Sequence, residues 1–415
     1  LGQVMNACVG VSVYALAKAI SKDWRVGLLA AFFVTFVTKM PGYYLSWGRY
    51  TLLMGVMILP MAMAEAERLR MGTVKWWQGV GLFLLTAGTL LSHYLAAFLL
   101  GLYLVIVGVA WVIESVRARK IEWKPILSLA APALLALVVS MRWYIRVLRY
   151  SAAFVSTTVQ LPKGTLSLNP AQTDYLRYVL GPNVAYGLLG LAVLGVIWAL
   201  WKEKWRRFGA WTLLMYFFTI PMGITIFSFR SDYYGLILFI PVTILSSGLL
   251  VWFLIFMQEK VSAEKLSAAV ALIVICAFIG WGGWSNRDVV NDETVLITKS
   301  DVAALDWVKN HTPKDARFFV NTTSWGYGLY RGTDGGGWLL PTTGRWSLAP
   351  TIFYTYGADK ITSELWTDWA KRATKVTTCE TNFWELVEEA DLNYVYVRDS
   401  AGSLRAKALI GCQGL

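Results

Sequence analysis

Long apolar segments alternate with short polar loops over the first two-thirds of the chain. Charged residues are sparse within the segments and collect in the loops between them. A membrane-spanning helix needs about 17–25 mostly apolar residues. The pattern therefore predicts a polytopic α-helical membrane protein with about ten spans, at roughly 4–20, 26–40, 52–65, 76–92, 94–113, 125–142, 183–201, 211–226, 235–257 and 267–284.

The loops fall into two sets that alternate along the chain. Every second loop is short and basic, as at Lys22 to Arg25 or Lys202 to Arg207. The positive-inside rule places these basic loops in the cytoplasm. The other set is then external, and it comprises 43–49, 92–94, 143–182, 228–234 and everything after 284.

This topology gives the chain an external N-terminus, although it starts at Leu1 without an initiator methionine or a signal sequence. We therefore expect at least one further span and an external loop upstream of Leu1. That loop could carry catalytic residues.

Composition supports the membrane assignment and excludes several classes of protein. Hydrophobic residues make up 56% of the chain and charged residues 15%, which excludes a soluble enzyme. The net charge of +12 lies largely in the predicted cytoplasmic loops, where it meets anionic lipid, so we expect no nucleic-acid partner. With two histidines and no Cys/His cluster, no zinc site is expected.

From residue 285 the sequence changes to a mixed pattern typical of a soluble α/β domain. We expect helices at 300–310 and 383–390 and strands at 317–321 and 394–398. Between them, residues 322–356 are predicted to be irregular and are rich in Gly, Trp and Tyr. The chain is thus divided into a transmembrane helical bundle, 1–284, and an external α/β domain, 285–415.

Three polar residues at predicted external span ends are candidates for binding a lipid phosphate. The planar guanidinium groups of Arg49 and Arg230 match phosphate oxygens. His93, in a tight external turn, could donate to phosphate or carry a proton. The alternatives stay open: either arginine could only extend to the membrane interface, Arg230 could pair with Asp232, and His93 could be an ordinary polar turn residue.

The Gly- and Trp-rich stretch is suited to a carbohydrate or a peptide. Aromatic faces stack on sugars, acidic and basic groups supply hydrogen bonds, and glycines allow the backbone to approach a ligand. The alternative is a packed loop that anchors the external domain on the bundle. The candidates for binding sugar or acceptor are Trp325, Tyr327, Asp334, Trp338 and Arg345.

Four cysteines divide between the two parts of the chain. Cys8 and Cys276 lie in predicted spans, where they pack as small apolar residues. Cys379 and Cys412 lie in the predicted external domain and could form a disulfide in an oxidising compartment, or remain free thiols. The spans show no paired carboxylates, which disfavours a proton-coupled transporter.

The layout and two short stretches resemble the GT-C superfamily of membrane glycosyltransferases. The stretch 229–234 is similar to the entry of a late span in those enzymes, where an arginine meets the carrier phosphate; here this is Arg230. Residues 304–313, a following strand and 324–328 resemble the start of the external domain in oligosaccharyltransferase catalytic subunits. Those subunits carry a Trp-Trp-Asp-Tyr-Gly motif, whereas this chain has Ser324 and Gly326, so a sequon-reading role is not carried over.

The resemblance implies transfer of a sugar from a polyprenyl-phosphate carrier to a glycan or protein acceptor, in the cell membrane, with the C-terminal domain extracytoplasmic. It places the catalytic carboxylate upstream of Leu1, so no catalytic residue is named in this chain. No cofactor is assigned, and a divalent metal held partly by that upstream loop stays open. The alternatives are a non-catalytic membrane subunit of a larger assembly or a lipid or solute transporter.

Overall fold

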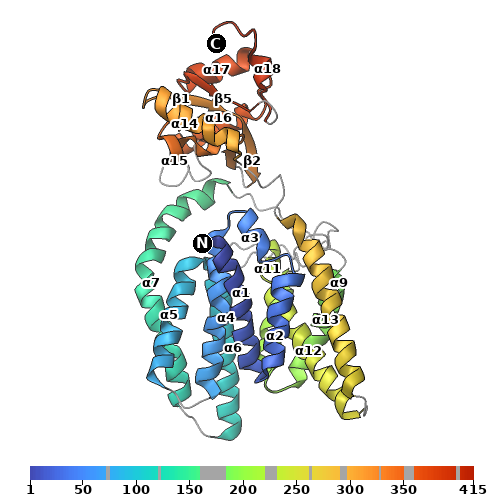
Figure 1. Ribbon diagram of the computed structural model, residues 1–415. Helices are drawn as coiled ribbons and strands as arrows, with labels where there is room; N and C mark the ends of the chain where they lie inside the picture. Colours follow the sequence, from blue (N-terminus) through green and yellow to red (C-terminus); the bar gives the residue numbers. More distant parts are fainter. Residues whose placement is uncertain are drawn as a thin grey trace. The chain divides into compact units, whose positions relative to one another are not determined.

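The computed structural model describes residues 1–71, 75–119, 123–158, 184–219, 231–260, 264–289, 297–326, 329–349, 359–398 and 402–415. They form two compact units (Figure 1). The first contains Leu1–Trp143 and Pro162–Val290, and the second contains Tyr144–Leu161 and Asn291–Leu415. The boundary between the main parts thus falls at 290, close to the 284 that the composition indicates.

The first unit is helical throughout its described part. Its elements are α1 (Gly2–Ser21), α2 (Trp24–Phe32), the π-helix η1 (Phe33–Val37), α3 (Gly42–Ser46), α4 (Tyr50–Met71), α5 (Trp76–Ser92), α6 (Tyr94–Ala118), α7 (Trp123–Thr158), α9 (Val184–Trp201), α10 (Arg206–Thr219), α11 (Ser231–Gly235), α12 (Phe239–Lys260), α13 (Glu264–Asn286) and the short 3₁₀ turn η2 (Arg287–Val289). The end of α7 is grouped with the second unit.

Local signals explain where several of these helices begin and end. Asp23 caps α2 by accepting a hydrogen bond from the Arg25 backbone N–H at 2.8 Å. His93 ends α5 and caps α6, which allows a one-residue turn between two antiparallel helices. Arg119 ends α6 in the left-handed conformation.

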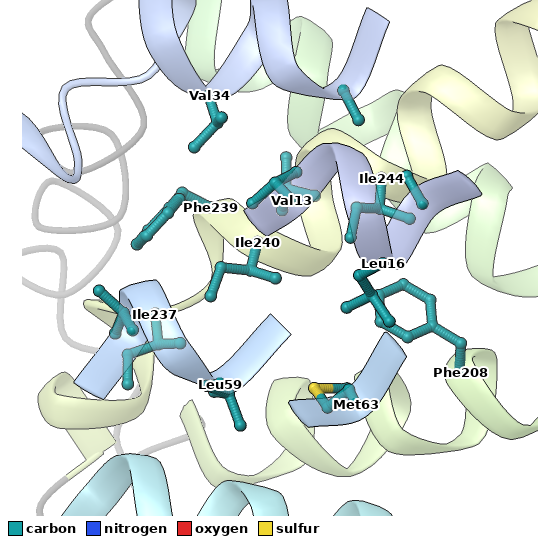
Figure 2. Close-up of a cluster of buried hydrophobic side chains, with 14 of the residues drawn as sticks. Val13, Leu16, Val34, Leu59, Met63, Phe208, Ile237, Phe239, Ile240 and Ile244 are labelled. Atoms are coloured by element: carbon teal, nitrogen blue, oxygen red, sulfur yellow. The ribbon is translucent and has the colours of Figure 1, made fainter. Parts of the chain in front are cut away.

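The core of this unit lies where α1, α4 and α12 meet. α1 packs against α2 and α4, and α12 packs against α2 and α9. Figure 2 shows Leu16 of α1, Leu59 of α4 and Ile240 of α12 turned toward one another, and all three are fully buried. Burying each such side chain contributes about 1.5–3 kcal/mol. Residues from the first and last thirds of the unit are thus held together at its centre.

The prediction of about ten spans is not supported. Each predicted segment contains helix, but only four helices in the described part of the chain are long and apolar enough to cross a membrane: Gly2–Ser21, Tyr94–Ala118, Trp123–Arg146 and Phe239–Glu259. The others fall short for physical reasons. α5 has 17 residues and α10 has 14, while α4 carries four charged residues in its last turns. The four apolar helices indicate a membrane protein.

The second unit is a small α/β fold. Its elements after α7 are α14 (Lys299–His311), β1 (Arg317–Val320), β2 (Thr322–Gly326), β3 (Leu329–Gly332), η4 (Gly336–Trp338), α15 (Leu339–Thr343), β4 (Trp346–Ser347), α16 (Lys360–Ala373), α17 (Thr381–Glu389), β5 (Tyr394–Tyr396) and α18 (Ala406–Leu409). The two helices and two strands expected from the sequence are confirmed within one or two residues.

Two sheets organise this unit. β1 pairs in parallel with β4 and with β5, in the order β4-β1-β5. β2 and β3 form an antiparallel hairpin, with Thr322 opposite Gly332. The stretch 322–356 was predicted to be irregular, and that prediction is wrong where the hairpin, η4, α15 and β4 lie. Strands of four or five residues that include glycine show too little alternation of apolar and polar residues to be recognised in the sequence.

Candidate functional site at one end of the helical unit

Three segments that are far apart in the sequence meet at one end of the helical unit. They are the loop from α3 to α4, the turn from α5 to α6, and α11. The guanidinium of Arg49 lies over the Trp47 ring at 5.4 Å and over the Tyr233 ring at 5.8 Å. Tyr44 donates from Oη to the Leu236 carbonyl at 2.7 Å, which joins α3 to the chain just after α11. These contacts bring an arginine and several aromatic rings into one site.

Arg49 is positioned by the backbone around it. Gly48 adopts the left-handed conformation, with φ of 66°, which favours glycine and lets the chain reverse after α3. The Arg49 N–H then donates to the Tyr44 carbonyl at 2.8 Å, and its own carbonyl accepts from Leu53 at 2.9 Å. Arg49 therefore stands at the N-terminus of α4, where the unpaired N–H groups also favour an anion.

His93 lies close enough to Arg49 for the positive charge of Arg49 to affect its pKa. Burial first, and the Arg49 cation second, lower the pKa of His93 to about 4. The imidazole is therefore neutral near pH 7. Its Nδ1 accepts a hydrogen bond from the Leu95 N–H at 3.2 Å, so the ring proton is on Nε2. Nε2 is thus a neutral hydrogen-bond donor beside a cation.

A glycine on α4 makes room for this histidine. A Cβ at Gly55 would lie 2.9 Å from the Ala96 Cβ and 3.1 Å from the His93 Cβ. The turn between α5 and α6 can therefore approach α4 closely only because residue 55 has no side chain. The His93 ring also stacks on Tyr94, with centroids 4.4 Å apart.

The remaining phosphate candidate, Arg230, lies outside the described residues. So does Tyr327 of the Gly- and Trp-rich stretch, and Trp325 lies in β2 with a side chain that is not described. Their predicted roles stay predictions.

Arg345 is buried inside the second unit, and its guanidinium is occupied there. It donates to the carbonyls of Thr343 at 2.6 Å, Thr312 at 2.7 Å and Lys309 at 2.9 Å. These bonds tie the C-terminal end of α14 to the segment between α15 and β4. Arg345 therefore helps to hold the domain together, and its predicted contact with sugar or acceptor stays a prediction.

Asp334 is also buried, and it accepts a hydrogen bond from Asn321 Nδ2 at 2.8 Å. Asn321 in turn accepts from the Leu404 N–H at 2.9 Å, so Asp334 belongs to an internal network. Trp338 differs from both because 43% of its surface is exposed. Among the sugar or acceptor candidates with described side chains, Trp338 is therefore the exposed one.

Cys379 and Cys412 are joined by a disulfide, the first of the two states considered from the sequence. The bond connects the segment before α17 to the chain after α18, with the Cα atoms 6.1 Å apart. Among the described residues, no group of three or more His, Cys, Asp or Glu side chains could hold a metal ion.

A buried charged cluster near the end of α4 was missed by the sequence analysis. Glu67 is 1% exposed and accepts hydrogen bonds from Tyr103 Oη at 2.7 Å and from Arg207 Nε and Nη2 at 3.2 and 3.1 Å. Arg70 lies 3.6 Å from the same carboxylate. Glu67 lies just beyond the predicted span 52–65, and α4 buries it together with Glu65. The signal available in the sequence was the pair Glu65 and Glu67, two residues apart in an alanine-rich stretch that is typical of a helix.

The fold is similar to that of a solved archaeal protein. The Archaeoglobus fulgidus oligosaccharyltransferase, in a complex with zinc and sulfate, matches with a TM-score of 0.53 and 12% sequence identity over 95% of this chain and 55% of that one. Its apo form matches with a TM-score of 0.44 and 11% identity over 95% of this chain and 57% of that one. The first likeness is a likeness of fold alone.

This chain thus spans little more than half the length of that oligosaccharyltransferase. No protein-family model matches the sequence, and no curated protein matches it.

Proposed function

We propose that this chain is part of a membrane glycosyltransferase that takes a sugar from a polyprenyl-phosphate carrier and transfers it to a glycan or protein acceptor on the external face. The observation that carries the proposal is the meeting of Arg49, His93 and the surrounding aromatic rings at one end of a GT-C-like helical unit. The oligosaccharyltransferase activity named for the archaeal neighbour points to the same class of reaction.

The chemistry of the site suits a phosphate on a lipid. A guanidinium offers a planar set of donors to phosphate oxygens. The rings of Trp47 and Tyr233 hold that plane in place by cation–π contact. The neutral Nε2–H of His93 adds a donor that carries no charge of its own. The first N–H groups of α4 add a favourable field for an anion.

In this proposal the described residues bind the carrier. The base that activates the acceptor is not assigned to a residue of the described chain. A non-catalytic membrane subunit that binds the same carrier is the second candidate, and it is favoured by the burial of Arg345, whose guanidinium is hydrogen-bonded inside the second unit.

The test compares Arg49→Gln with Arg287→Gln in membranes that contain the full-length protein. Arg287 is a matched control because its guanidinium also lies over an indole, that of Trp284 at 3.9 Å. Losing charge-assisted hydrogen bonds to phosphate should lower the rate of sugar transfer from a labelled polyprenyl-linked donor about tenfold to a hundredfold. The control should retain normal transfer.

Two other outcomes are informative. If carrier binding depends on Arg49 while no transfer occurs in wild type, the chain is the carrier-binding subunit of an assembly. If Arg49→Gln transfers sugar at the wild-type rate, the proposal is wrong.

A further inference from the structure

A groove in the second unit lies between α14 and β5. Its volume is about 440 Å³, which is within the range typical of ligand pockets. One wall is residues 394–398, which are β5 and the two residues after it, and Phe318 of β1 also lines the groove. The other wall is a single face of α14, made by residues one, three or four positions apart: Ser300, Asp301, Ala304, Trp307 and Val308.

The edge of β5 runs along this groove. Side chains of a strand alternate between the two faces of a sheet. The side chain of Tyr396 turns toward α14, where its Oη donates to Asp301 at 3.2 Å. Val395, the preceding residue of β5, therefore points to the opposite face, yet it lines the same groove. Neighbouring residues of opposite orientation line one groove where the open edge of their strand borders it.

β5 is an edge strand in the described part of the chain. The sheet order is β4-β1-β5, so β1 pairs with one side of β5 and no described strand pairs with the other. Alternate N–H and C=O groups of an edge strand point away from the sheet and are a template for another strand. Many natural edge strands are protected by lysine or proline, but residues 394–397 read Tyr-Val-Tyr-Val. This edge is thus suited to accept one more strand.

The side chains of the groove favour an uncharged, apolar partner. The two charged residues that line it, Asp301 and Arg398, pair with each other at 3.3 Å, so the groove has no net charge. Asp301 is also occupied by its hydrogen bond from Tyr396. Trp307 is 55% exposed, and its ring stacks on His311 with centroids 5.1 Å apart, which holds a large apolar surface at the groove.

These features select one class of ligand. A hydrocarbon would leave the outward backbone groups of β5 without partners. A glycan would meet an apolar wall and an acid that is already paired. An extended peptide supplies a donor and an acceptor at nearly every residue, and it places its side chains with the same period of two as β5.

We propose that this groove binds an extended, uncharged peptide segment of another protein, with apolar side chains at alternate positions, as an added strand beside β5. A segment of about five residues is about 17 Å long and would cover the edge from 394 to 398. The proposal does not rest on sugar transfer by this chain.

The experiment measures peptide binding to the full chain in phosphatidylcholine nanodiscs by fluorescence anisotropy. The probe is the uncharged heptapeptide Ser-Val-Thr-Val-Ser-Val-Thr, labelled at its N-terminus and amidated at its C-terminus. The reference is the same peptide methylated on every backbone nitrogen between its residues, which keeps the side chains but removes the donors along its backbone. We expect the probe to bind saturably and the methylated peptide to bind at least about tenfold more weakly.

Variants locate the bound peptide. Ala304 lines the groove, whereas its neighbour Ala303 is exposed on α14 and does not line it. Ala304→Phe should obstruct the groove and weaken binding at least about tenfold, and Ala303→Phe is the matched control that should bind as wild type does. Trp307→Ala removes an exposed apolar wall and should also weaken binding about tenfold.

Amide hydrogen exchange tests the mode of binding. An added strand should slow exchange of the outward-facing amides within 393–398 at saturating peptide, whereas unchanged exchange there would contradict strand addition. Maltopentaose is the glycan probe, and displacement of the peptide by maltopentaose would assign the groove to carbohydrate and overturn the proposal.

The proposal is also overturned if the peptide does not bind to wild type, or if the methylated peptide binds equally well. Wild-type affinity in both Ala304→Phe and Trp307→Ala would overturn it too. Two variants of different kinds are used so that poor folding of one still leaves a decisive result.

Discussion

At the scale of single residues, the buried polar groups decide what the helical unit can do. Glu67 and Arg207 are almost fully buried and are paired with each other, and Glu67 also accepts a hydrogen bond from Tyr103. Such a pair is costly to break, because removing one partner leaves a charge in a medium of low polarity. The cluster therefore fixes how α4, α6 and α10 pack together.

Replacing Arg207 by Met should lower the free energy of unfolding of the helical unit by about 3–5 kcal/mol, because it leaves the Glu67 carboxylate without its main partner. Thermal or denaturant unfolding in detergent measures this. Arg287→Met is the control, since the side chains of Arg287 and its partner Asp288 are 56% and 69% exposed and the change should cost less than about 1 kcal/mol. Equal effects of the two variants would contradict the account of the cluster.

His93 gives a prediction about pH. Its pKa falls from 6.5 to about 4 on folding, mainly through burial and then through Arg49. A group with a depressed pKa contributes stability that is present above pH 6.5 and lost as the pH falls toward 4. His93→Asn keeps a cap for Leu95 and does not titrate, so it should lose less stability than wild type over that range.

The measurement is the unfolding midpoint of the helical unit between pH 7 and 4. His311→Asn, in the exposed last turn of α14, is the control and should follow the wild-type curve. If wild type and His93→Asn lose stability in parallel, the histidine is not held neutral by the fold.

At the scale of elements, the sequence predicted helices well and short strands poorly. Long, mostly apolar segments mark α1, α6 and α12. The hairpin β2–β3 could not be seen, because its strands are short, contain glycine and pair only with each other. The internal bonds of Arg345 could not be foreseen from its Gly and Trp neighbours, because two of its partners, the carbonyls of Lys309 and Thr312, lie more than 30 residues earlier in the chain.

Arg345→Met should loosen the end of α14, because it leaves the carbonyls of Lys309 and Thr312 without their donors, at a cost of about 1–3 kcal/mol. Amide hydrogen exchange across 305–316 and 343–348 measures this, and both segments should exchange faster than in wild type. Arg372→Met, which removes exposed pairs with Glu385 and Glu389, should leave these segments unchanged. Unchanged exchange in Arg345→Met would contradict its structural role.

At the scale of the whole molecule, the charges of the loops predicted which loops lie together, whereas the lengths of the apolar segments did not give a reliable number of spans. The alternation of basic and non-basic loops put the Arg49 segment, the His93 turn and the Tyr233 segment on one face, and the structure joins these three segments. The predicted number of spans is not supported, because several described helices of the bundle are too short or too charged to cross a membrane alone.

The central claim is that Arg49 binds the phosphate of a lipid carrier. The most direct measurement is the affinity of a polyprenyl phosphate for the full chain in nanodiscs, for wild type, Arg49→Gln and Arg287→Gln. The account predicts that Arg49→Gln weakens binding at least about tenfold while Arg287→Gln binds as wild type does. Equal affinity of all three proteins would contradict it.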